Sequence, residues 1–394
     1  MSLALSSMTV AGIMSGTSAD GIDVAFTHIT PDPENPEFPT LKLLFHAGFP
    51  FPSALRRAVL ASMNAQSIST GELARLNWRL GQAYSEALEL ALQRNPCKID
   101  LIGCHGQTIY HQAVAERYLG REVACTWQIG EMALMAQRIR VPVVSNFRPA
   151  DMVVGGKGAP LVPLLDYVLF CHPTRGRVLQ NLGGIGNLTA LPPGASSLQV
   201  VAFDTGPGNM VIDQLMQQLF QRTFDRGGKT AARGSVINNV VDAKLRHKFF
   251  EARPPKAAGR EEFGRDYTAR FLEACTKISG RAEDAIASAT ALTARSVGMA
   301  YSNFVSQSMK GAGVDFIVSG GGARNLTLMR MLSEQLVPQG CTVQSSDEVG
   351  LPAEAKEAAA FALLAYETWH RRAGNVPSAT GAARPVILGQ ITYV

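Results

Sequence analysis

Three apolar segments of this chain each end directly in a loop rich in glycine. The segments end at Met14, Phe203 and Ser319. Short apolar runs bounded by glycine are typical of buried strands. In open α/β sheets, ligands gather at the ends of the strands. The sequence therefore predicts an α/β protein whose three glycine loops converge on one ligand.

The first of these loops, Ser15–Asp23, combines glycines, hydroxyls and two aspartates. Glycine lets backbone N–H groups approach an anion closely, and hydroxyls add hydrogen-bond donors. Asp20 is a candidate magnesium ligand, usually through water. The alternative is a plain β-hairpin turn, because Asp-Gly is a strong turn signal. The presence of two further loops favours a nucleotide phosphate site.

Composition and charge limit the class of protein. The chain has 394 residues, of which 46% are hydrophobic and 18% charged, enough for two domains with full cores. The net charge of +5 comes without a long basic run, so no nucleic-acid partner is expected, although a phosphorylated ligand is compatible. No apolar run approaches the ~18 residues that span a bilayer, so no membrane partner is expected.

The cysteines and the N-terminal residues indicate a cytoplasmic protein. The six cysteines are scattered and form no Cys-x-x-Cys pair, as expected of free thiols in a reducing compartment. The first apolar residues run straight into the glycine loop, so a cleaved signal peptide, which would remove that strand, is not expected.

Strand and helix signals alternate along the chain. Two strands are expected within Met8–Phe26, around the first loop, and a capping box at Ser69 and Glu72 opens a helix that ends before Pro96. Further strands are expected at Ile99–Gly103, Val141–Ser145, from Arg177, at Gln199–Phe203, Asp315–Ser319 and Thr342–Gln344. Further helices are expected around Leu161–Phe170 and Ile212–Leu219, across 265–312, around Leu328–Leu336 and over Pro352–Trp369. Phe224–Gly264 reads as irregular, with a helical piece near Val240–Phe250. This pattern predicts two similar halves, each an α/β lobe.

Two acidic residues are candidates for chemistry. Asp204 ends an apolar strand before a glycine turn, where a carboxylate can act as general base. The alternative is a turn-forming aspartate. Glu357 shares a helical face with Phe361 and Leu364, and burying a carboxylate beside them is costly unless it is paired or bound to a ligand. The alternative is that Glu357 lies at the exposed end of the apolar stripe.

A cation and a histidine are candidates for substrate binding. Arg148 can clamp an anionic group with two hydrogen bonds, or it can form a structural ion pair with Asp151. His105 follows a buried strand and shares its loop with Gln107, so it either binds substrate hydroxyls or is a buried structural histidine. The Walker A and Gly-x-Gly-x-x-Gly patterns are absent from the sequence, which argues against a Rossmann dehydrogenase.

The candidate residues belong to a series of motifs that follow one another in a fixed order. These motifs are Met14–Asp23, Cys104–Thr108, Phe147–Asp151, Gly158–Pro163, Asn181–Asn187, Phe203–Asn209, Gly320–Asn325, Glu357–Ala362 and Asn375–Ala382. Together they resemble the anhydro-N-acetylmuramic acid kinases, which are sugar kinases of the superfamily of actin, hexokinase and the Hsp70 ATPase domain. The resemblance spans nearly the whole chain.

The resemblance implies a two-lobed actin-like or hexokinase-like ATPase fold, with a central mixed sheet in each lobe and an interlobe active-site cleft. We expect residues 1–150 to form the first lobe, completed by the C-terminal helix near 352–394, and residues 151–351 to form the second. The implied cofactors are ATP and Mg²⁺, and a homodimer is expected.

The resemblance also implies a reaction. Water attacks the anomeric carbon of a 1,6-anhydro sugar while O6 takes the γ-phosphate, giving N-acetylmuramate 6-phosphate. Asp204 is the implied base. His105, Arg148 and Glu357 are expected at the sugar, and Asp20 and Glu357 at the metal. The residues expected at ATP are Gly16, Thr17, Ser18, Ala19, Asp20, Gly21, Ile22, Asp23, Gly206, Gly208, Asn209, Gly320, Gly321, Gly322 and Asn325.

Three positions depart from the family pattern. Asn146 stands where aspartate is expected, Glu131 where aspartate is usual, and Lys157 where glutamine is usual. Asn146 and Lys157 bear on the sugar pocket more than on the reaction type. One alternative is therefore a kinase of levoglucosan, the anhydro sugar without acetamido and lactyl groups. Another is an ATP-gated binding protein of the same fold.

Overall fold

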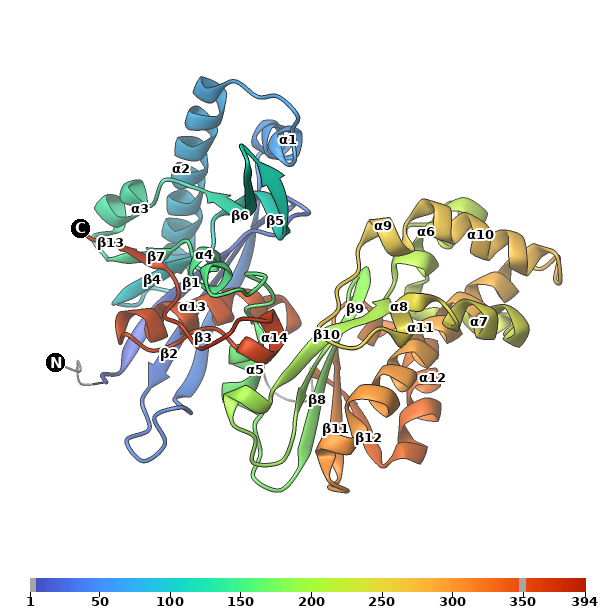
Figure 1. Ribbon diagram of the computed structural model, residues 1–394. Helices are drawn as coiled ribbons and strands as arrows, with labels where there is room; N and C mark the ends of the chain where they lie inside the picture. The colour runs from blue at the N-terminus through green and yellow to red at the C-terminus, as the bar shows by residue number, and fades with distance from the viewer. Residues whose placement is uncertain (1–4, 347–351) are drawn as a thin grey trace. The chain divides into compact units, whose positions relative to one another are not determined.

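The computed structural model describes residues 5–346 and 352–394, and the chain divides into two compact units (Figure 1). Unit 1 comprises Met1–Leu169 and Glu354–Val394, and unit 2 comprises Phe170–Ala353. The boundary lies later than residue 150, because the buried Asp151 carboxylate accepts hydrogen bonds from Asn375 and Thr380 of the C-terminal segment.

Unit 1 is built on a mixed six-stranded sheet in the order β13-β7-β4-β1-β2-β3. Strands β1, β2 and β3 form an antiparallel meander. Strand β4 pairs parallel with β1, and β7 pairs parallel with β4. The strands are β1 (Met8–Met14), β2 (Gly21–Thr30), β3 (Thr40–Pro50), β4 (Leu101–Cys104), β7 (Val143–Ser145) and β13 (Gln390–Thr392). A separate hairpin, β5 (Gln107–Tyr118) and β6 (Arg121–Ile129), follows β4.

The helices of unit 1 include the long helix that the capping signal predicts. Ser69 accepts a hydrogen bond from the Glu72 backbone N–H at 3.1 Å, and the helix ends at Arg94, before Pro96. The helices are α1 (Ser53–Ser62), α2 (Thr70–Arg94), α3 (Met132–Ile139), α4 (Arg148–Val153), α5 (Pro163–Phe170), α13 (Lys356–Trp369) and α14 (Pro377–Thr380). The hairpin β5–β6 and strand β3 were not predicted.

Helix α13 lies unusually close to the centre of this sheet. Gly12 of β1 and Gly103 of β4 are register partners. A Cβ atom on Gly12 would lie 1.8 Å from the Ala358 carbonyl oxygen, and one on Gly103 would lie 2.1 Å from the Phe361 carbonyl oxygen. Glycine is therefore required at both positions, because the backbone of α13 occupies the space that a side chain would need.

Unit 2 is built on a five-stranded sheet in the order β10-β9-β8-β11-β12. Its first three strands form an antiparallel meander, and β11 and β12 continue the sheet in parallel. The strands are β8 (Gly176–Leu182), β9 (Ile185–Leu191), β10 (Val201–Pro207), β11 (Val314–Ser319) and β12 (Cys341–Ser345). The order β3-β2-β1-β4-β7 in unit 1 follows the same scheme, so the predicted architectural repeat is confirmed.

The helices of unit 2 are α6 (Met210–Phe220), α7 (Asn238–Leu245), α8 (Lys248–Glu251), α9 (Arg260–Phe263), α10 (Arg265–Thr276), α11 (Ala282–Phe304) and α12 (Leu326–Leu336). The stretch 224–264 is more regular than predicted. Its aromatic residues Phe249, Phe250 and Phe263 are buried and pack ring against ring at 5.3–5.7 Å, so they anchor the two short helices α8 and α9 to the core.

All six cysteines are free thiols, as predicted. Within residues 5–346 and 352–394, no helix is long and apolar enough to cross a membrane.

The close approach of α13 predicts a large effect of one methyl group. Gly12→Ala should lower the free energy of unfolding by about 2 kcal/mol or more, because α13 must move away from β1. The measurement is urea unfolding followed by circular dichroism. The matched control is Gly280→Ala, where the new Cβ meets no atom within 4 Å, and its effect should stay within about 1 kcal/mol. Equal effects of the two substitutions would contradict the packing argument.

Candidate active site

The loop after β1 is held by buried hydrogen bonds. The Ser15 hydroxyl lies 2.7 Å from the Tyr84 hydroxyl and donates to the Gly106 carbonyl at 3.3 Å. Gln107 donates from its amide to the Gly16 carbonyl at 3.2 Å. These hydrogen bonds join the loop after β1 to the loop after β4, so polar groups at the ends of two parallel strands lie side by side.

The residues expected at ATP differ in what they expose. Thr17, Ser18 and Asp20 are exposed, whereas the side chains of Ala19 and Ile22 are buried. Ala19 and Ile22 can therefore offer a ligand only their backbone atoms. The loop connects antiparallel neighbours, so the hairpin-turn reading describes its geometry correctly, and the exposed hydroxyls and N–H groups still form a donor surface.

Arg148 and His105 form one hydrogen-bonded pair in unit 1. Arg148 donates from Nε to His105 Nε2 at 3.0 Å and from one terminal nitrogen to the Gly158 carbonyl at 2.6 Å. Burial lowers the pKa of Arg148 to about 10, although Glu357 and Asp151 oppose this shift. Within the described residues no ion pair joins Arg148 and Asp151, so the structural bridge considered above is not formed. The guanidinium is held at one edge and retains donors for an anion.

His105 is buried and neutral. Its Nδ1 lies 2.7 Å from the Gly106 carbonyl, to which it donates, and this leaves Nε2 to accept from Arg148. Burial, and secondly the Arg148 charge, hold the pKa of His105 well below its usual value. The imidazole ring packs against Phe361 of α13 at 4.7 Å. His105 therefore orients Arg148 directly, and both readings of this residue, structural and functional, keep their support.

Asp151 belongs to the motif Phe147–Asp151 without being predicted as a site residue, and it organises the glycine loop beside Arg148. Its carboxylate accepts from the Gly158 N–H at 2.8 Å, from Asn375 at 2.8 Å and from Thr380 at 2.7 Å. Because Gly158 provides the carbonyl that holds Arg148, Asp151 positions the guanidinium through one peptide segment.

Glu357 lies at the start of α13, where its side chain is exposed, in agreement with the alternative reading. Surrounding protein atoms and then the Asp23 carboxylate raise its pKa, while Arg148 and Lys356 lower it. The structure therefore brings Asp23, rather than Asp20, into the electrostatic neighbourhood of Glu357. Asp20 instead pairs with Arg56 at 2.9 Å. Within the described residues, no three acidic, histidine or cysteine side chains form a ready metal cage.

Three glycine turns of unit 2 come together. Asn209 donates from its backbone to the Gly183 carbonyl at 2.7 Å and from its side chain to the Leu182 carbonyl at 2.9 Å. A Cβ on Gly320 would lie 2.9 Å from that same Leu182 oxygen, and one on Gly322 would lie 3.3 Å from the Asn209 side chain. The turns after β8, β10 and β11 therefore meet, as predicted for the second and third loops.

Two helices of unit 2 begin at these turns. Helix α6 starts after Asn209, and helix α12 starts after Asn325. Asn325 is buried and its side-chain oxygen accepts from the Leu328 N–H at 3.0 Å, so that oxygen caps the helix. Helix N-termini of this kind favour phosphate oxygens.

Asp204 lies in the middle of β10 rather than at the end of a strand as expected, and a shift in pairing register follows it, between Asp204 and Gly206. Its N–H donates to the Lys256 carbonyl at 3.0 Å, and its carboxylate accepts from the Ala258 N–H at 2.7 Å. The backbone of 256–258 therefore holds the candidate base on two sides.

Lys256 is a residue of this site that no sequence motif indicated. It is buried, its ammonium group donates to the carbonyls of Phe249 and Phe250 at 3.0 and 3.3 Å, and it lies 4.7–5.6 Å from three phenylalanine ring centres. Burial lowers its pKa to about 8, and the nearby Asp204 carboxylate opposes the shift. The charge that faces Asp204 is thus fixed in place by an aromatic cage.

The structure shows the local setting of each of the three residues that depart from the family pattern. Glu131 caps α3, because its carboxylate accepts from the Ala133 N–H at 3.1 Å, so it is structural. Asn146 has a φ of 55°, a conformation that asparagine tolerates well. Lys157 donates its backbone N–H to the Thr380 carbonyl at 2.9 Å and adjoins the Gly158 peptide that holds Arg148.

The repeated sheet order, with a helix-covered mixed sheet in each unit, defines the actin-like and hexokinase-like class of ATPase folds. A family model described as anhydro-N-acetylmuramic acid kinase matches residues 8–394. The chain belongs to this family of ATP-dependent kinases.

Curated relatives agree over nearly their full length. Proteins named anhydro-N-acetylmuramic acid kinase from two strains of Bacillus cereus, ATCC 10987 / NRS 248 and AH187, are each 41% identical to this chain. Each alignment covers 98% of this chain and 99% of the relative.

Solved structures resemble the whole chain only loosely. The activator of the 2-hydroxyisocaproyl-CoA dehydratase from Clostridium difficile with bound ADPNP has a TM-score of 0.41 at 10% identity, covering 91% of this chain and 95% of that one. A ROK family glucokinase from Streptomyces griseus in complex with glucose and AMPPNP has a TM-score of 0.37 at 10% identity, covering 91% and 99%.

The buried neutral His105 predicts how stability depends on pH. In the unfolded chain this histidine binds a proton near its usual pKa of 6.5, whereas in the fold it does so only at much lower pH. Its contribution is therefore full above pH 6.5 and is lost as the pH falls below that value, by up to about 1.4 kcal/mol per pH unit. His105→Gln should flatten this acid-side loss in urea unfolding measured between pH 7 and pH 5.

The control for this experiment is His28→Gln on β2, which leaves His105 in place and should keep the wild-type loss of stability. An unchanged pH slope in His105→Gln would contradict the prediction, because it would show that folding does not lower the pKa of His105.

Proposed function

We propose that this protein is an ATP-dependent kinase that opens the 1,6-anhydro ring of anhydro-N-acetylmuramic acid and phosphorylates O6, giving N-acetylmuramate 6-phosphate, a step in the recycling of cell-wall sugars. The main support for this proposal is the match to the family model over residues 8–394. It is supported by the site residues, since backbone groups hold Asp204 within β10 and His105 holds Arg148.

Asp204 is the proposed general base of the reaction. It takes a proton from water as the water oxygen bonds to the anomeric carbon. The bond between that carbon and O6 breaks, and O6 bonds to the γ-phosphorus while ADP leaves. Two backbone hydrogen bonds orient the Asp204 carboxylate, and the caged Lys256 charge favours its ionised form. Most of the rate gain then comes from positioning and electrostatics, as expected for phosphoryl transfer.

The glycine turns of both units are the proposed ATP contacts. In unit 1, the loop Gly16–Asp23 offers exposed hydroxyls and backbone N–H groups. In unit 2, the turns at Gly206–Asn209 and Gly320–Gly322 precede helix N-termini. Because the side-chain oxygen of Asn325 caps α12, we propose that Asn325 contacts ATP only through its other atoms.

Two carboxylates of unit 1, Glu357 at the start of α13 and Asp23 on β2, fit magnesium. Carboxylate oxygens and water are the ligands that Mg²⁺ prefers. Burial and then the Asp23 carboxylate raise the pKa of Glu357, and a bound cation would favour the ionised form of both carboxylates. We therefore propose that Glu357 and Asp23 hold the metal, and that Asp20 joins them only if its ion pair with Arg56 opens. Magnesium would neutralise charge on the phosphates.

Arg148 and His105 are the proposed contacts to the sugar. The remaining guanidinium donors of Arg148 suit the lactyl carboxylate of anhydro-N-acetylmuramic acid. Levoglucosan is the second candidate, because the departures at Asn146 and Lys157 flank the segment that carries Arg148. An ATP-gated binding protein is the third, and it would need neither a base nor sugar turnover.

The deciding experiment supplies Mg-ATP with either anhydro-N-acetylmuramic acid or levoglucosan and identifies the product by mass spectrometry. The proposal expects N-acetylmuramate 6-phosphate, formed with one water added and one ADP released. Glucose 6-phosphate formed faster from levoglucosan would support the second candidate. Binding of ATP without formation of any sugar product would support the third candidate, an ATP-gated binding protein.

Substituting the proposed base should separate chemistry from binding. Asp204→Asn should lower kcat by about 10²–10⁴-fold, because proton removal from water is lost, while the Kd for ATP stays near that of the wild type. The measurements are steady-state ADP release and calorimetric ATP binding. The control is Asp242→Asn, an exposed aspartate on α7 paired with Arg295, which should keep wild-type kcat. A fully active Asp204→Asn enzyme would remove Asp204 from the mechanism.

The same proposal places the enzyme in the cytoplasm, where six free thiols are stable, and gives it a homodimeric state.

A further inference from the structure

Two loops of unit 1 meet at one carbonyl oxygen, that of Gly106 in the loop after β4. The Ser15 hydroxyl, from the loop after β1, donates to this oxygen at 3.3 Å, and His105 Nδ1 donates to it at 2.7 Å. Both donor side chains are buried. A carbonyl oxygen has two lone pairs, and these two hydrogen bonds use both of them.

The hydrogen bonds continue beyond both donors. On one side, His105 Nε2 accepts from Arg148 Nε at 3.0 Å. On the other side, the Ser15 hydroxyl lies 2.7 Å from the hydroxyl of Tyr84 on α2. Because Ser15 uses its single proton on the Gly106 carbonyl, the Tyr84 hydroxyl donates to Ser15. We call this set of residues the Gly106 network, and in order its members are Tyr84, Ser15, Gly106, His105 and Arg148.

The Gly106 network joins the two proposed ligand contacts of unit 1. Ser15 opens the loop whose residues Gly16–Asp23 are proposed for ATP, and Arg148 is proposed for the sugar. Arg148 is only partly buried, so its remaining donors are accessible to a ligand, whereas the other members are buried. The network is therefore a direct hydrogen-bonded connection between the proposed ATP loop and the proposed sugar contact.

Tyr84 is the fixed end of the Gly106 network. Its side chain is fully buried, and a Cβ on Gly130 would lie 2.7 Å from a ring carbon of Tyr84. The Gly130 N–H donates to the Asn77 side chain at 2.7 Å, so α2 itself holds the segment that packs on the ring. Burial, and secondly Cys104, raise the pKa of the Tyr84 hydroxyl well above its usual value, so this hydroxyl stays protonated and can donate.

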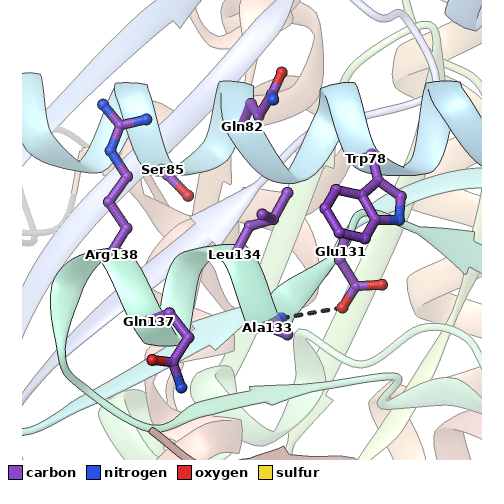
Figure 2. A pocket seen from close by; sticks show the side chains of 8 residues that line it. All are labelled: Trp78, Gln82, Ser85, Glu131, Ala133, Leu134, Gln137 and Arg138. Carbon is purple, nitrogen blue, oxygen red and sulfur yellow. Dashed lines mark hydrogen bonds between the residues drawn. The ribbon is translucent and has the colours of Figure 1, made fainter.

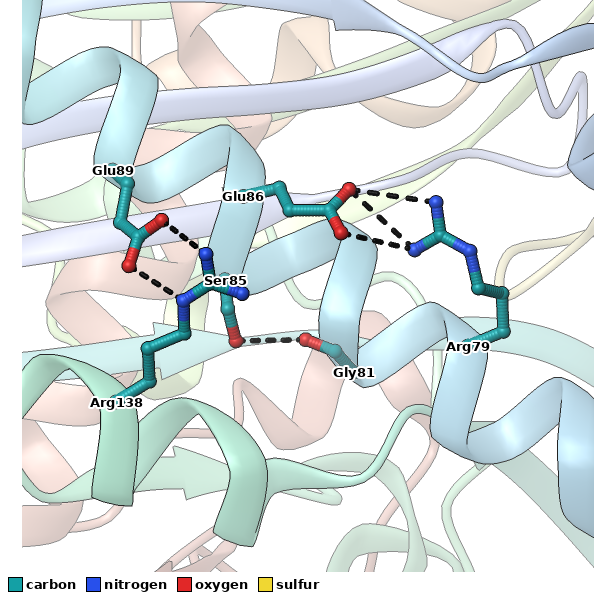
Figure 3. A network of polar contacts seen from close by, with 6 residues as sticks. All are labelled: Arg79, Gly81, Ser85, Glu86, Glu89 and Arg138. Carbon is teal, nitrogen blue, oxygen red and sulfur yellow. Dashed lines mark hydrogen bonds and ion pairs between the residues drawn. The ribbon is translucent and has the colours of Figure 1, made fainter.

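Helix α2 packs closely against α3, and this packing fixes the place of Tyr84. A Cβ on Gly81 would lie 2.5 Å from the Glu131 carbonyl oxygen, so the backbones of α2 and of the α3 N-cap are in direct contact. Figure 2 shows the two helices alongside each other, with the Glu131 carboxylate on the Ala133 N–H at the start of α3. Figure 3 shows Arg138 of α3 bound to Glu89 of α2, at 2.6 Å.

We propose that Tyr84 is a positioning residue of the kinase and that the Gly106 network couples the binding of ATP to the binding of the sugar. Because Tyr84 is fully buried, it acts through Ser15 and not by contact with a substrate. This inference rests on the proposed function and adds to it the residues that join its two substrate contacts in unit 1.

The coupling follows from the entropy cost of ordering the network. A phosphate bound at the loop after β1 restricts Ser15, and a carboxylate bound to Arg148 restricts Arg148 and His105. Because both ends share the Gly106 carbonyl, the first ligand orders groups that the second ligand needs, and the second ligand binds more tightly. The coupling is reciprocal, so each ligand strengthens the binding of the other by the same factor.

The test compares the wild type with Tyr84→Phe, which keeps the ring against Gly130 and removes only the hydroxyl. Calorimetry gives the Kd of anhydro-N-acetylmuramic acid with and without saturating Mg²⁺ and AMPPNP, a non-hydrolysable ATP analogue, and the ratio of the two Kd values is the coupling factor. The wild-type factor should be about fivefold or more. Tyr84→Phe should lower it at least about threefold, the loss expected for one hydrogen bond.

The matched control is Tyr366→Phe, which removes the hydroxyl of another fully buried tyrosine of unit 1. That hydroxyl donates to the Ser6 carbonyl at 3.2 Å, outside the Gly106 network. Both substitutions should lower the free energy of unfolding in urea, but only Tyr84→Phe should lower the coupling factor.

A double-mutant cycle tests the route from Tyr84 through Ser15. Tyr84→Phe and Ser15→Ala remove the same hydrogen bond, so the variant that carries both substitutions should lose no more coupling than Ser15→Ala alone. Losses that add up would mean that the two side chains act separately, which would overturn the inference.

The inference and the proposed function fail in different ways. A wild type that forms the phosphorylated sugar but has no coupling would overturn the inference alone. Equal coupling in the wild type and Tyr84→Phe, or equal losses in Tyr84→Phe and Tyr366→Phe, would leave Tyr84 a purely structural residue. A wild type that binds no anhydro-N-acetylmuramic acid would overturn the proposed function and the inference with it.

Discussion

The close contact between α13 and the centre of the unit 1 sheet is the constraint on which its candidate site depends. Gly12 and Gly103 leave room for the helix backbone, and the helix offers mainly alanine toward them. Because the helix axis is fixed this tightly, Glu357 at its first turn and Phe361 one turn later have defined places. Phe361 packs on His105, and His105 orients Arg148. A shift of α13 by the size of one methyl group would pass to all of these side chains.

Backbone atoms, and not only other side chains, position the two main candidate site residues, Arg148 and Asp204. The Gly158 carbonyl holds Arg148, and the Ala258 N–H holds Asp204. In each case a buried polar side chain secures the segment concerned: Asp151 in unit 1 and Lys256 in unit 2. Burial lowers the pKa of Lys256 from 10.5 to about 8, so its cost to the stability of unit 2 develops as the pH falls from 10.5 to about 8 and is full below that. Its retention is consistent with a role beside the base.

The sequence predicted those features of the fold that depend on residues close together in the chain. The strand–loop motifs, the capped helix α2 and the shared face of Glu357 and Phe361 follow from periodicity and turn chemistry. The hairpin β5–β6 was missed because most of its residues are exposed, so they carry no alternating apolar signal. Lys256 was missed because its cage joins Phe203, Phe249 and Phe304, which no sequence window contains together. The choice between Asp20 and Asp23 near Glu357 likewise depends on which carboxylate Arg56 captures.

The discontinuity of unit 1 has a consequence for the order in which the chain acquires structure. Unit 2 is one continuous segment, whereas unit 1 needs Glu354–Val394 to cover β1 and β4. During synthesis from the N-terminus, every residue of unit 2 therefore leaves the ribosome before the helix that closes the unit 1 core. Until then the face of β1 and β4 that α13 covers stays open to solvent, so nascent unit 1 exposes apolar surface that can aggregate.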